Sequence, residues 1–199
     1  MEDPLELLRN IKSVAIATVY KDRPEVRMAD VMLHEDGKLY FLTARGKPYY
    51  KQLKANPEIS IVAMDENYVS ARVKGMIEFV GKRLLDRIFD ENTAMNHIYP
   101  GDTREILEVF CLQKGVGEIF DISASIPKRE RFAFGGETVN EPGYSINDKY
   151  TACGLCKDSC PTGALNEGDV YSIKRSLCFE CGNCYEKCPY DAIEMPFDF

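Results

Sequence analysis

The feature that most constrains this chain is a dense array of cysteines near its C-terminal end. Seven of the eight cysteines fall within the 36 positions from Cys153 to Cys188. The first half of the array reads C-x2-C-x3-C-P from Cys153, and the second reads C-x2-C-x2-C-x3-C-P from Cys178. Three thiolates at the second spacing can surround one cubane cluster, while the fourth cysteine points to a neighbouring cluster. The array therefore predicts a small segment that metal clusters hold together.

The two halves also match beyond their cysteines, because residues 160–164 read CPTGA and residues 188–192 read CPYDA. This similarity indicates an internal duplication. Structural zinc also uses paired C-x2-C motifs, but seven cysteines with a close triplet and two Cys-Pro ends fit zinc poorly. Disulfides are disfavoured by the same close spacing and by the lack of a secretory leader. Iron–sulfur ligation is the interpretation that fits the spacing best.

One ligand position is vacant. When the halves are aligned on their Cys-Pro ends, Tyr150 stands opposite Cys178. The crossed ligation of two-cluster arrays then predicts one complete cluster and one that lacks a thiolate. The complete set is Cys160, Cys178, Cys181 and Cys184, and the incomplete set is Cys153, Cys156 and Cys188.

Three outcomes stay open at the incomplete site. It holds a [3Fe-4S] cluster, or it holds a [4Fe-4S] cluster whose fourth ligand is water, a small thiol, Tyr150 or Asp148, or it is empty and its cysteines are structural. An iron without a thiolate is able to bind a substrate, whereas the simpler interpretation is the loss of a second relay.

This segment, from about Tyr144 to Met195, resembles bacterial two-cluster ferredoxins. The resemblance implies a pseudo-symmetric α+β ferredoxin fold and one-electron transfer at low potential.

The rest of the chain reads as a compact α+β domain over residues 1–122, followed by a linker over 123–143 and the cysteine-rich domain over 144–199. Apolar periodicity predicts an antiparallel barrel with flanking helices. We expect helices at 4–11, 48–55 and 82–99, strands at 13–20, 25–33, 39–43, 58–64 and 68–80, and a final hairpin of 106–112 and 116–122 around Lys114-Gly115. Cys111 is expected to pack inside this barrel.

The linker contains the basic run Lys128-Arg129-Glu130-Arg131 and then Phe132-Ala133-Phe134. The simpler interpretation is a connector whose phenylalanines dock on one domain. The alternative is a lid over a cofactor, with Arg129 or Arg131 near an anion.

Charge and hydropathy exclude several classes of protein. The chain has 25 Lys+Arg, 32 Asp+Glu and a net charge of −7, so we expect no nucleic-acid partner. No apolar run approaches the roughly 20 residues of a membrane helix, and the acidic start does not resemble a secretory leader. We therefore expect no membrane contact and a cytoplasmic location.

A candidate phosphate site lies where a strand end meets a helix start. Residues 43–47 read TARGK and are followed by Pro48, and Arg27 lies on a preceding hairpin strand. A hydroxyl and two cations beside a helix N-terminus suit a phosphate, although a basic turn is often only solvated.

Residues 37–57, GKLYFLTARGKPYYKQLKANP, together with Arg72-Val73-Lys74-Gly75 and the strand at 107–112, resemble the FMN-binding split barrel of the pyridoxamine 5′-phosphate oxidase-like family. The resemblance covers about residues 4–122 and implies FMN at the interface of a homodimer, although a deazaflavin occupies some barrels of this kind. Its implied contacts are Arg27, Thr43, Ala44, Arg45 and Lys47 for the phosphate and ribityl chain, Met28, Ala29, Asp30, Tyr49, Tyr50 and Gln52 near the flavin ring, and Ser70 and Arg72 from the partner subunit.

Together these features predict an iron–sulfur flavoprotein oxidoreductase of an anaerobic cell. An external donor or acceptor exchanges electrons with the clusters, and FMN reduces an unidentified substrate. The alternatives are an electron carrier without a substrate of its own, and a binding or sensing module that uses the incomplete cluster. The sequence identifies no catalytic residue, although Tyr40, Tyr49 and Tyr50 are possible proton donors.

Overall fold

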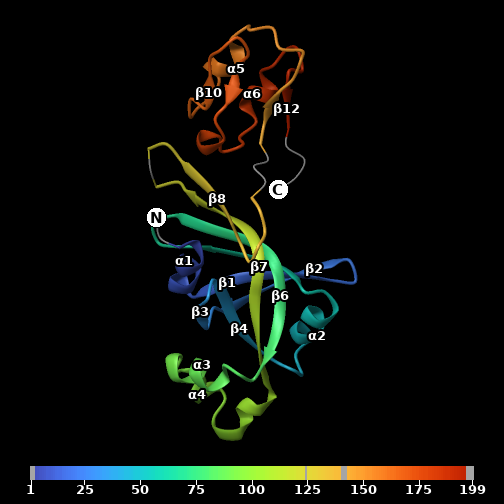
Figure 1. The fold of residues 1–199 in the computed structure, drawn as a ribbon, viewed down its shortest axis with the longest axis vertical. Coiled ribbons are helices and arrows are strands. Elements are labelled where there is room, and N and C mark those ends of the chain that lie inside the picture. Colours follow the sequence, from blue (N-terminus) through green and yellow to red (C-terminus); the bar gives the residue numbers. More distant parts are fainter. Residues whose placement is uncertain (1–2, 124, 140–142, 196–199) are drawn as a thin grey trace. The chain divides into compact units, whose positions relative to one another are not determined.

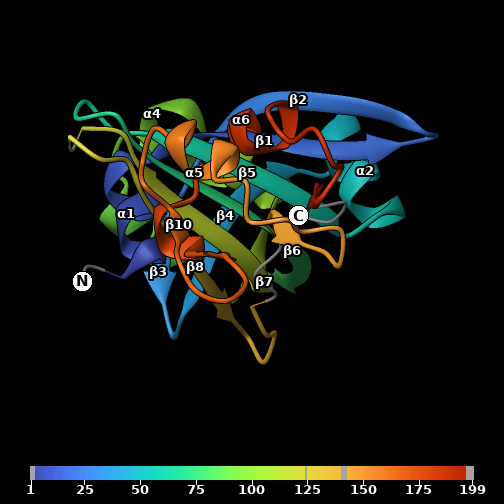
Figure 2. The same ribbon diagram turned by 90° about the horizontal axis from the view of Figure 1, so that it is seen from above.

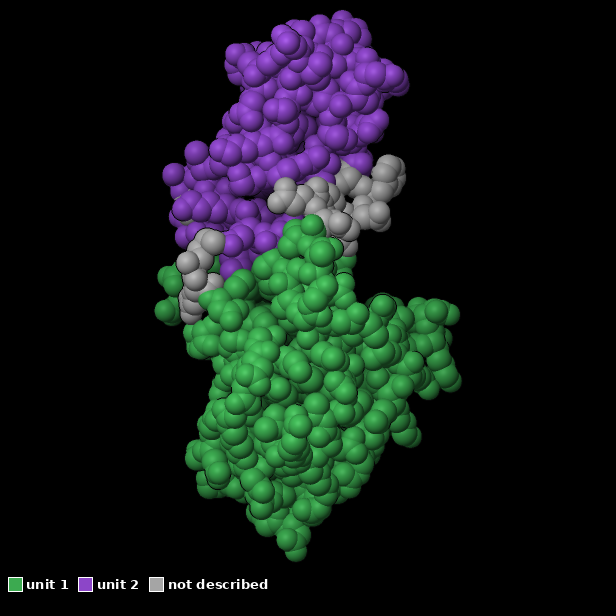
Figure 3. Space-filling view, viewed as in Figure 1, with its two compact units in different colours: residues 1–118, 132–139 green, residues 119–131, 140–199 purple. Residues whose placement is uncertain are grey.

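The computed structural model describes residues 3–123, 125–139 and 143–195. The chain divides into two compact units (Figure 3). Unit 1 comprises residues 1–118 and 132–139, and unit 2 comprises residues 119–131 and 140–199. The segment expected as a linker, 123–143, differs from that expectation because it contains a strand, β8 (Lys128–Phe134), whose residues are shared between the units. No helix in the described part of the chain is long and apolar enough to cross a membrane.

Unit 1 is built on an eight-stranded sheet with the order β2-β1-β5-β6-β7-β4-β3, and β8 pairs with β7 (Figures 1 and 2). Pairs β1–β2, β1–β5, β5–β6, β4–β7 and β3–β4 are antiparallel. This is the predicted antiparallel barrel with flanking helices. Its strands are β1 (Ser13–Tyr20), β2 (Arg23–Asp30), β3 (Leu33–Glu35), β4 (Lys38–Ala44), β5 (Glu58–Met64), β6 (Val69–Gly81) and β7 (Leu107–Asp121).

Local chemistry explains the first two helices. In α1 (Pro4–Ile11) the Asp3 carboxylate accepts the Leu5 N–H at 2.9 Å and caps the first turn. In α2 (Pro48–Ala55) proline occupies the first turn, where a missing N–H costs nothing. Both helices have the predicted bounds. Their apolar faces pack on a core of buried residues that includes Leu8, Leu53 and Phe110.

The predicted helix over 82–99 is interrupted, and the structure has α3 (Leu85–Glu91) and α4 (Met95–Ile98) in its place. The break is at Asn92, whose side-chain amide donates to the Ile88 carbonyl at 2.9 Å and to the Met32 carbonyl at 3.0 Å. A buried side chain that bonds the last carbonyls ends a helix in the way that a cap does. A 3-10 helix, η1 (Gly101–Ile106), then leads into β7.

The predicted hairpin around Lys114-Gly115 is wrong, because β7 runs unbroken from Leu107 to Asp121. Glycine is needed here for close approach of two backbones, not for a turn. A Cβ on Gly75 of β6 would collide with the Lys114 carbonyl oxygen, and one on Gly115 would collide with the Lys74 carbonyl oxygen. Glycine in a strand interior is typical of such contacts.

Unit 2 contains a duplicated domain. Helix α5 (Leu155–Asp158) and strand β10 (Leu165–Asn166) recur 28 positions later as α6 (Asn183–Glu186) and β12 (Ile193–Glu194). The same offset relates positions with φ in the left-handed region, namely Ala152 and Glu180, Gly154 and Gly182, and Gly163 and Asp191. The remaining elements are β9 (Ser145–Ile146), which pairs with β12, β11 (Ser172–Ile173), which pairs with β10, and η2 (Arg175–Leu177). This is the expected α+β ferredoxin fold.

Candidate functional site

The cysteines of unit 2 gather around two separate cavities. The first cavity is lined by Cys160, Cys178, Cys181 and Cys184. These four residues come from both halves of the duplication, and they are the set that crossed ligation assigns to a complete cluster. Tertiary folding therefore brings the predicted ligands of that cluster to one place.

The second cavity is lined by Cys153, Cys156 and Cys188, and Tyr150 is part of the same wall. The Tyr150 ring packs against Tyr171, with ring centroids 5.4 Å apart. Its hydroxyl oxygen is buried and has no hydrogen-bond partner among the described residues. A tyrosine therefore lines this cavity at the sequence position of the missing thiolate.

Equivalent backbone amides donate hydrogen bonds to a cysteine sulfur in each half of the duplication. The Ala164 N–H donates to Cys160 Sγ at 3.3 Å, and the Ala192 N–H donates to Cys188 Sγ at 3.3 Å. Hydrogen bonds to the sulfurs are among the features that set the potential of a cluster. The Thr162 hydroxyl lies 3.6 Å from Cys160 Sγ, and the second half has Tyr190 at that position.

Burial disfavours the thiolate form of one cysteine of the first cavity. Burial raises the pKa of Cys184 to about 11, so its thiol is protonated at neutral pH unless a metal replaces the proton. Among the described residues, no three cysteine, histidine or carboxylate side chains are close enough to hold one metal ion. A single zinc needs four ligands at about 2.0–2.3 Å. The C-x2-C-x2-C-x3-C-P run from Cys178, whose first three cysteines line the first cavity, is typical of [4Fe-4S] ligation rather than of zinc.

In unit 1, Arg27 lies at the centre of a polar group beneath α2. Its guanidinium donates to the Thr18 hydroxyl at 2.8 Å and to Gln52 Oε1 at 2.7 Å, and it lies over the Tyr49 ring. The Thr18 hydroxyl in turn donates to Gln52 Oε1 at 2.9 Å. In the described part of the chain, no carboxylate forms an ion pair with Arg27. Its positive charge is therefore available to an anionic ligand. Thr18 is not among the residues predicted from the sequence. It belongs to this group because Arg27 pairs with Ile16 across β1 and β2, which places Thr18, two residues further along β1, on the same face as Arg27.

Two buried hydroxyls of the predicted site lack partners. Thr43 Oγ1 on β4 and the Tyr49 hydroxyl on α2 form no hydrogen bond with any described residue. Burial raises the pKa of Tyr49 although Arg27 acts in the opposite direction, so its phenol stays protonated. Because a buried unpaired hydroxyl is unfavourable, both groups fit a ligand that supplies the missing bonds.

The loop between β4 and α2 places its residues differently. The Arg45 guanidinium donates to the Glu105 carbonyl oxygen at 2.8 Å, and Ala44 is buried in the hydrophobic cluster around Phe89. Lys47 is the N-cap residue of α2, and no side chain of the described residues caps the free N–H groups of that helix. Lys47 and the helix start therefore keep the features of an anion site.

The remaining predicted contacts are spread over the sheet. Met28 is exposed, and Asp30 accepts a hydrogen bond from the Ser13 hydroxyl at 2.6 Å. Tyr50 packs edge-on against Phe79. Three further predicted contacts are Ala29, which packs on the core, Ser70 on β6, and Arg72, which pairs with Glu118 at 2.9 Å.

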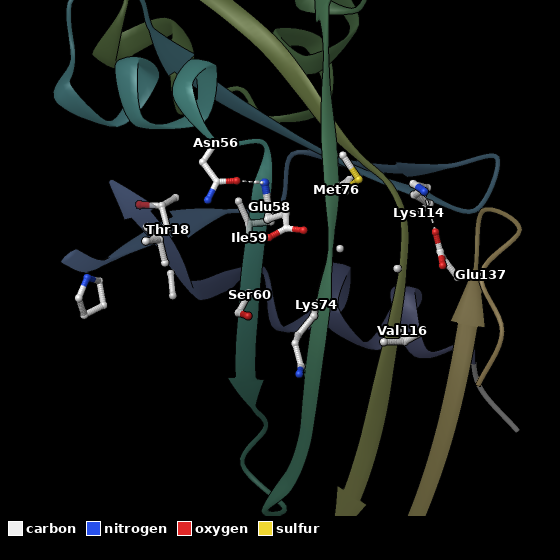
Figure 4. A pocket seen from close by; sticks show the side chains of 15 residues that line it. Thr18, Asn56, Glu58, Ile59, Ser60, Lys74, Met76, Lys114, Val116 and Glu137 are labelled. Carbon is white, nitrogen blue, oxygen red and sulfur yellow. Dashed lines mark hydrogen bonds and ion pairs between the residues drawn. The ribbon is translucent and has the colours of Figure 1, made fainter. Parts of the chain in front are cut away.

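A groove of about 430 Å³ crosses the outer face of the sheet over β1, β5, β6 and β7 (Figure 4). Lys114 and Glu137 form an ion pair of 2.7 Å at one side, and Lys74 and Ser60 line the floor. The groove is not predictable from local sequence, because its residues are contributed by strands that are distant in sequence. It contains none of the predicted flavin contacts.

A split barrel with a hydrogen-bonded polar group around Arg27, joined to a duplicated cysteine domain, defines a redox protein of the flavoprotein and ferredoxin class. The pyridoxamine 5′-phosphate oxidase family matches residues 2–107, and the 4Fe-4S dicluster domain matches residues 149–193. The chain belongs to the pyridoxamine 5′-phosphate oxidase family and has a 4Fe-4S ferredoxin domain at its C-terminal end. These two domains support oxidoreductase function, flavin binding and electron transfer.

Curated relatives match the cysteine domain. A ferredoxin of Butyribacterium methylotrophicum is 49% identical over 35 residues, which are 18% of this chain and 64% of that protein, slightly under two thirds of its length. A ferredoxin-like protein in the vnf region of Azotobacter chroococcum is 39% identical over 54 residues, which are 24% of this chain and 83% of that protein.

Solved structures match the barrel. A NimC/NimA family protein from Clostridium acetobutylicum is 24% identical with a TM-score of 0.58, and the match covers 65% of this chain and 89% of that one. A pyridoxamine 5′-phosphate oxidase-related, FMN-binding protein from Nostoc punctiforme is 14% identical with a TM-score of 0.51. The match covers 69% of this chain and 93% of that one. At these identities the likeness shows the fold alone.

Proposed function

We propose that this protein is an FMN-dependent oxidoreductase that receives electrons through its own iron–sulfur domain and passes them to a small-molecule substrate. The observation that carries the proposal is the presence, in one chain, of the polar group around Arg27 and of two cysteine-lined cavities. A chain that only carried electrons would need no second redox site of this kind.

The flavin site that we propose uses groups from three elements. Within the described residues, Arg27 supplies a cation whose hydrogen-bond partners are neutral, Thr43 and Tyr49 supply hydroxyls without a partner, and Lys47 stands at a helix start that no side chain caps. These groups suit a phosphorylated, hydrogen-bonding cofactor, and the similar protein from Nostoc punctiforme is an FMN-binding protein. When bound, FMN supplies exchange of single electrons with a cluster and of two electrons with a substrate.

In unit 2 the proposal assigns a [4Fe-4S] cluster to Cys160, Cys178, Cys181 and Cys184. A second cluster, of [4Fe-4S] or [3Fe-4S] type, is assigned to Cys153, Cys156 and Cys188, with Tyr150 at the vacant position. Cys156 and Cys184 are buried, one in each set, and the amides of Ala164 and Ala192 orient one further sulfur in each set.

We also propose a homodimer formed through the outer face of the sheet. Val26 and Met28 on β2 and Val62 and Met64 on β5 are 71%, 66%, 45% and 54% exposed. The strand registers place them on one face, since Ala15 pairs with both Met28 and Val62. Such a contiguous apolar surface is typical of an interface. A second copy of the chain fits it because an isologous contact pairs the face with itself.

The test uses full-length protein purified without oxygen. We expect flavin mass, iron and acid-labile sulfide in the same preparation, and bleaching of the flavin when a ferredoxin-type donor is added. The double variant Cys178→Ser/Cys181→Ser should keep its flavin but lose reduction by that donor, while dithionite still bleaches the flavin. A preparation without flavin would overturn the assignment, and unchanged reduction in the variant would overturn the electron path.

A further inference from the structure

Two arginines hold the carboxylate of Glu180, which lies in the loop between Cys178 and Cys181. Arg129 Nη1 is 2.8 Å from Glu180 Oε2, and Arg131 Nη2 is 2.6 Å from Glu180 Oε1. The arginine side chains are 11% and 10% exposed and the glutamate side chain 24%. Because the three groups are largely buried, solvent and salt screen their charges less than those of a surface pair.

The backbone of the loop does not need this carboxylate. Glu180 has a φ of 60°, and its counterpart in the first half, Ala152, has a φ of 56°. An alanine therefore adopts the same left-handed conformation 28 positions earlier in the chain. The glutamate and the arginines that bind it are a feature of one half of the duplication alone.

The charges are adjacent to one of the two cysteine sets. Glu180 lines the cavity of Cys178 and Cys181, and Arg129 is held against its carboxylate at 2.8 Å. Arg129 is fixed further by the ring of Phe120, whose centroid is 5.1 Å from the guanidinium carbon. By contrast, the described residues that line the other cavity include no Asp, Glu, Lys or Arg. The two sites thus have different electrostatic surroundings.

We propose that Arg129 and Arg131 are positioning residues that set the reduction potential of the cluster held by Cys160, Cys178, Cys181 and Cys184. Both arginines act through Glu180. Their ion pairs with its carboxylate fix the loop between Cys178 and Cys181 and offset the negative charge of Glu180. The inference rests on the proposed function, since it requires that cluster. Reduction by a one-electron donor adds one negative charge to the cluster while the donor loses one electron. Nearby positive charge stabilises the reduced form, and nearby negative charge opposes it.

The experiment is a redox titration of anaerobically purified full-length protein, followed by EPR, with iron and sulfide measured for every variant. Arg131→Gln removes a positive charge and should lower the midpoint potential of the four-thiolate cluster. Glu180→Gln has nearly the same shape, removes a negative charge and should raise that potential. We expect about a tenfold change in the redox equilibrium constant in each case, which is 59 mV for one electron.

Shifts of the midpoint potential in opposite directions in Arg131→Gln and Glu180→Gln distinguish an electrostatic effect from a structural one. A merely loosened loop would move the potential in the same direction in both variants. Arg131→Lys keeps the charge and should restore most of the wild-type potential. Ala152→Glu puts a carboxylate at the matched position of the other half and should leave the four-thiolate cluster unchanged. Equal potentials, or shifts of one sign, in Arg131→Gln and Glu180→Gln would overturn the inference. If Arg131→Gln does not assemble its cluster, the single variants Arg131→Lys and Glu180→Gln are compared instead. A potential that is raised in Glu180→Gln and unchanged in Arg131→Lys supports the inference, and any other result overturns it. Wild-type protein without iron and sulfide would overturn the proposed function itself.

Discussion

The guanidinium carbon of Arg27 lies 4.5 Å from the centre of the Tyr49 ring. This contact joins β2 to α2 and fixes a cation above an aromatic face, an arrangement that is favourable where water is excluded. The Tyr49 phenol keeps its proton because burial raises its pKa. The pair therefore offers a positive charge and a hydrogen-bond donor from two elements that are distant in sequence.

The first prediction concerns Arg27. Arg27→Gln should weaken flavin binding about 10- to 100-fold, since a hydrogen bond to a charged group contributes about 1.5–3 kcal/mol. Titration of the apoprotein with FMN, followed by quenching of flavin fluorescence, measures the affinity. Arg23→Gln changes an exposed arginine on the same strand and should have no effect. Equal affinities in the two variants would exclude Arg27 from the flavin site.

The two buried threonines should respond in opposite ways to removal of the hydroxyl. Thr43→Val removes a hydroxyl that has no hydrogen-bond partner among the described residues, so the apoprotein should be as stable as wild type or more stable, while flavin binding weakens. Thr18→Val removes a hydroxyl that bonds both Arg27 and Gln52, and should lower the free energy of unfolding by about 1–3 kcal/mol. Urea unfolding of both apoproteins, with and without FMN, checks this. A large loss of stability in apo Thr43→Val would contradict it.

Tyr150→Cys should complete the second set of thiolates. We expect the variant to keep a four-iron cluster at that site after mild oxidation, whereas the wild-type site gives a three-iron EPR signal. Tyr185→Cys, which adds a thiol at a position 40% exposed, is the matched control and should behave as wild type. A three-iron signal of the same size in Tyr150→Cys would show that Tyr150 does not occupy the vacant ligand position.

The proposed dimer face is tested with a buried charge. Val62→Asp should convert the dimer to a monomer, because an unpaired carboxylate in an apolar interface is strongly unfavourable. Light scattering after size-exclusion chromatography reads the mass directly. Val170→Asp changes an exposed valine of the cysteine domain and should leave the dimer intact. A wild-type monomer, or a dimeric Val62→Asp, would place the interface elsewhere.

The crossing of β6 and β7 is tested at its glycines. Gly75→Ala should lower the free energy of unfolding of the apoprotein by about 1–3 kcal/mol or more, since the added methyl collides with the Lys114 carbonyl oxygen. Gly46→Ala is the control, because a Cβ there has no heavy atom within 4 Å. If Gly75→Ala and Gly46→Ala lower the free energy of unfolding equally in thermal unfolding, β6 and β7 do not approach each other as closely as described.

Much of the fold follows from local sequence. The bounds of α1, α2 and β5 were predicted correctly, because each depends on nearby chemistry such as the proline at the first turn of α2. The cysteine domain was predictable for another reason. The spacing of its cysteines and its 28-residue repeat are visible in the sequence. The equivalence of the Tyr150 and Cys178 positions can therefore be recognised without a structure.

Local patterns failed where a residue serves a distant partner. Gly115 follows a lysine as in a turn, yet it is glycine because β6 passes against it. Asn92 lies within an apolar helical pattern, yet its amide reaches Met32 and ends the helix. Neither the contact of Gly115 with β6 nor that of Asn92 with Met32 can be predicted from the sequence of one segment.

By itself, the sequence determined that the chain has a barrel followed by a duplicated cysteine domain with one ligand position missing. Only the tertiary structure decided which side chains share a site. It placed Thr18 beside Arg27, and it gave the Glu180 carboxylate to Arg129 and Arg131. The physical reason is that cysteine spacing encodes a local geometry, whereas hydrogen bonds and ion pairs between elements depend on strand register and packing, which the whole chain sets together.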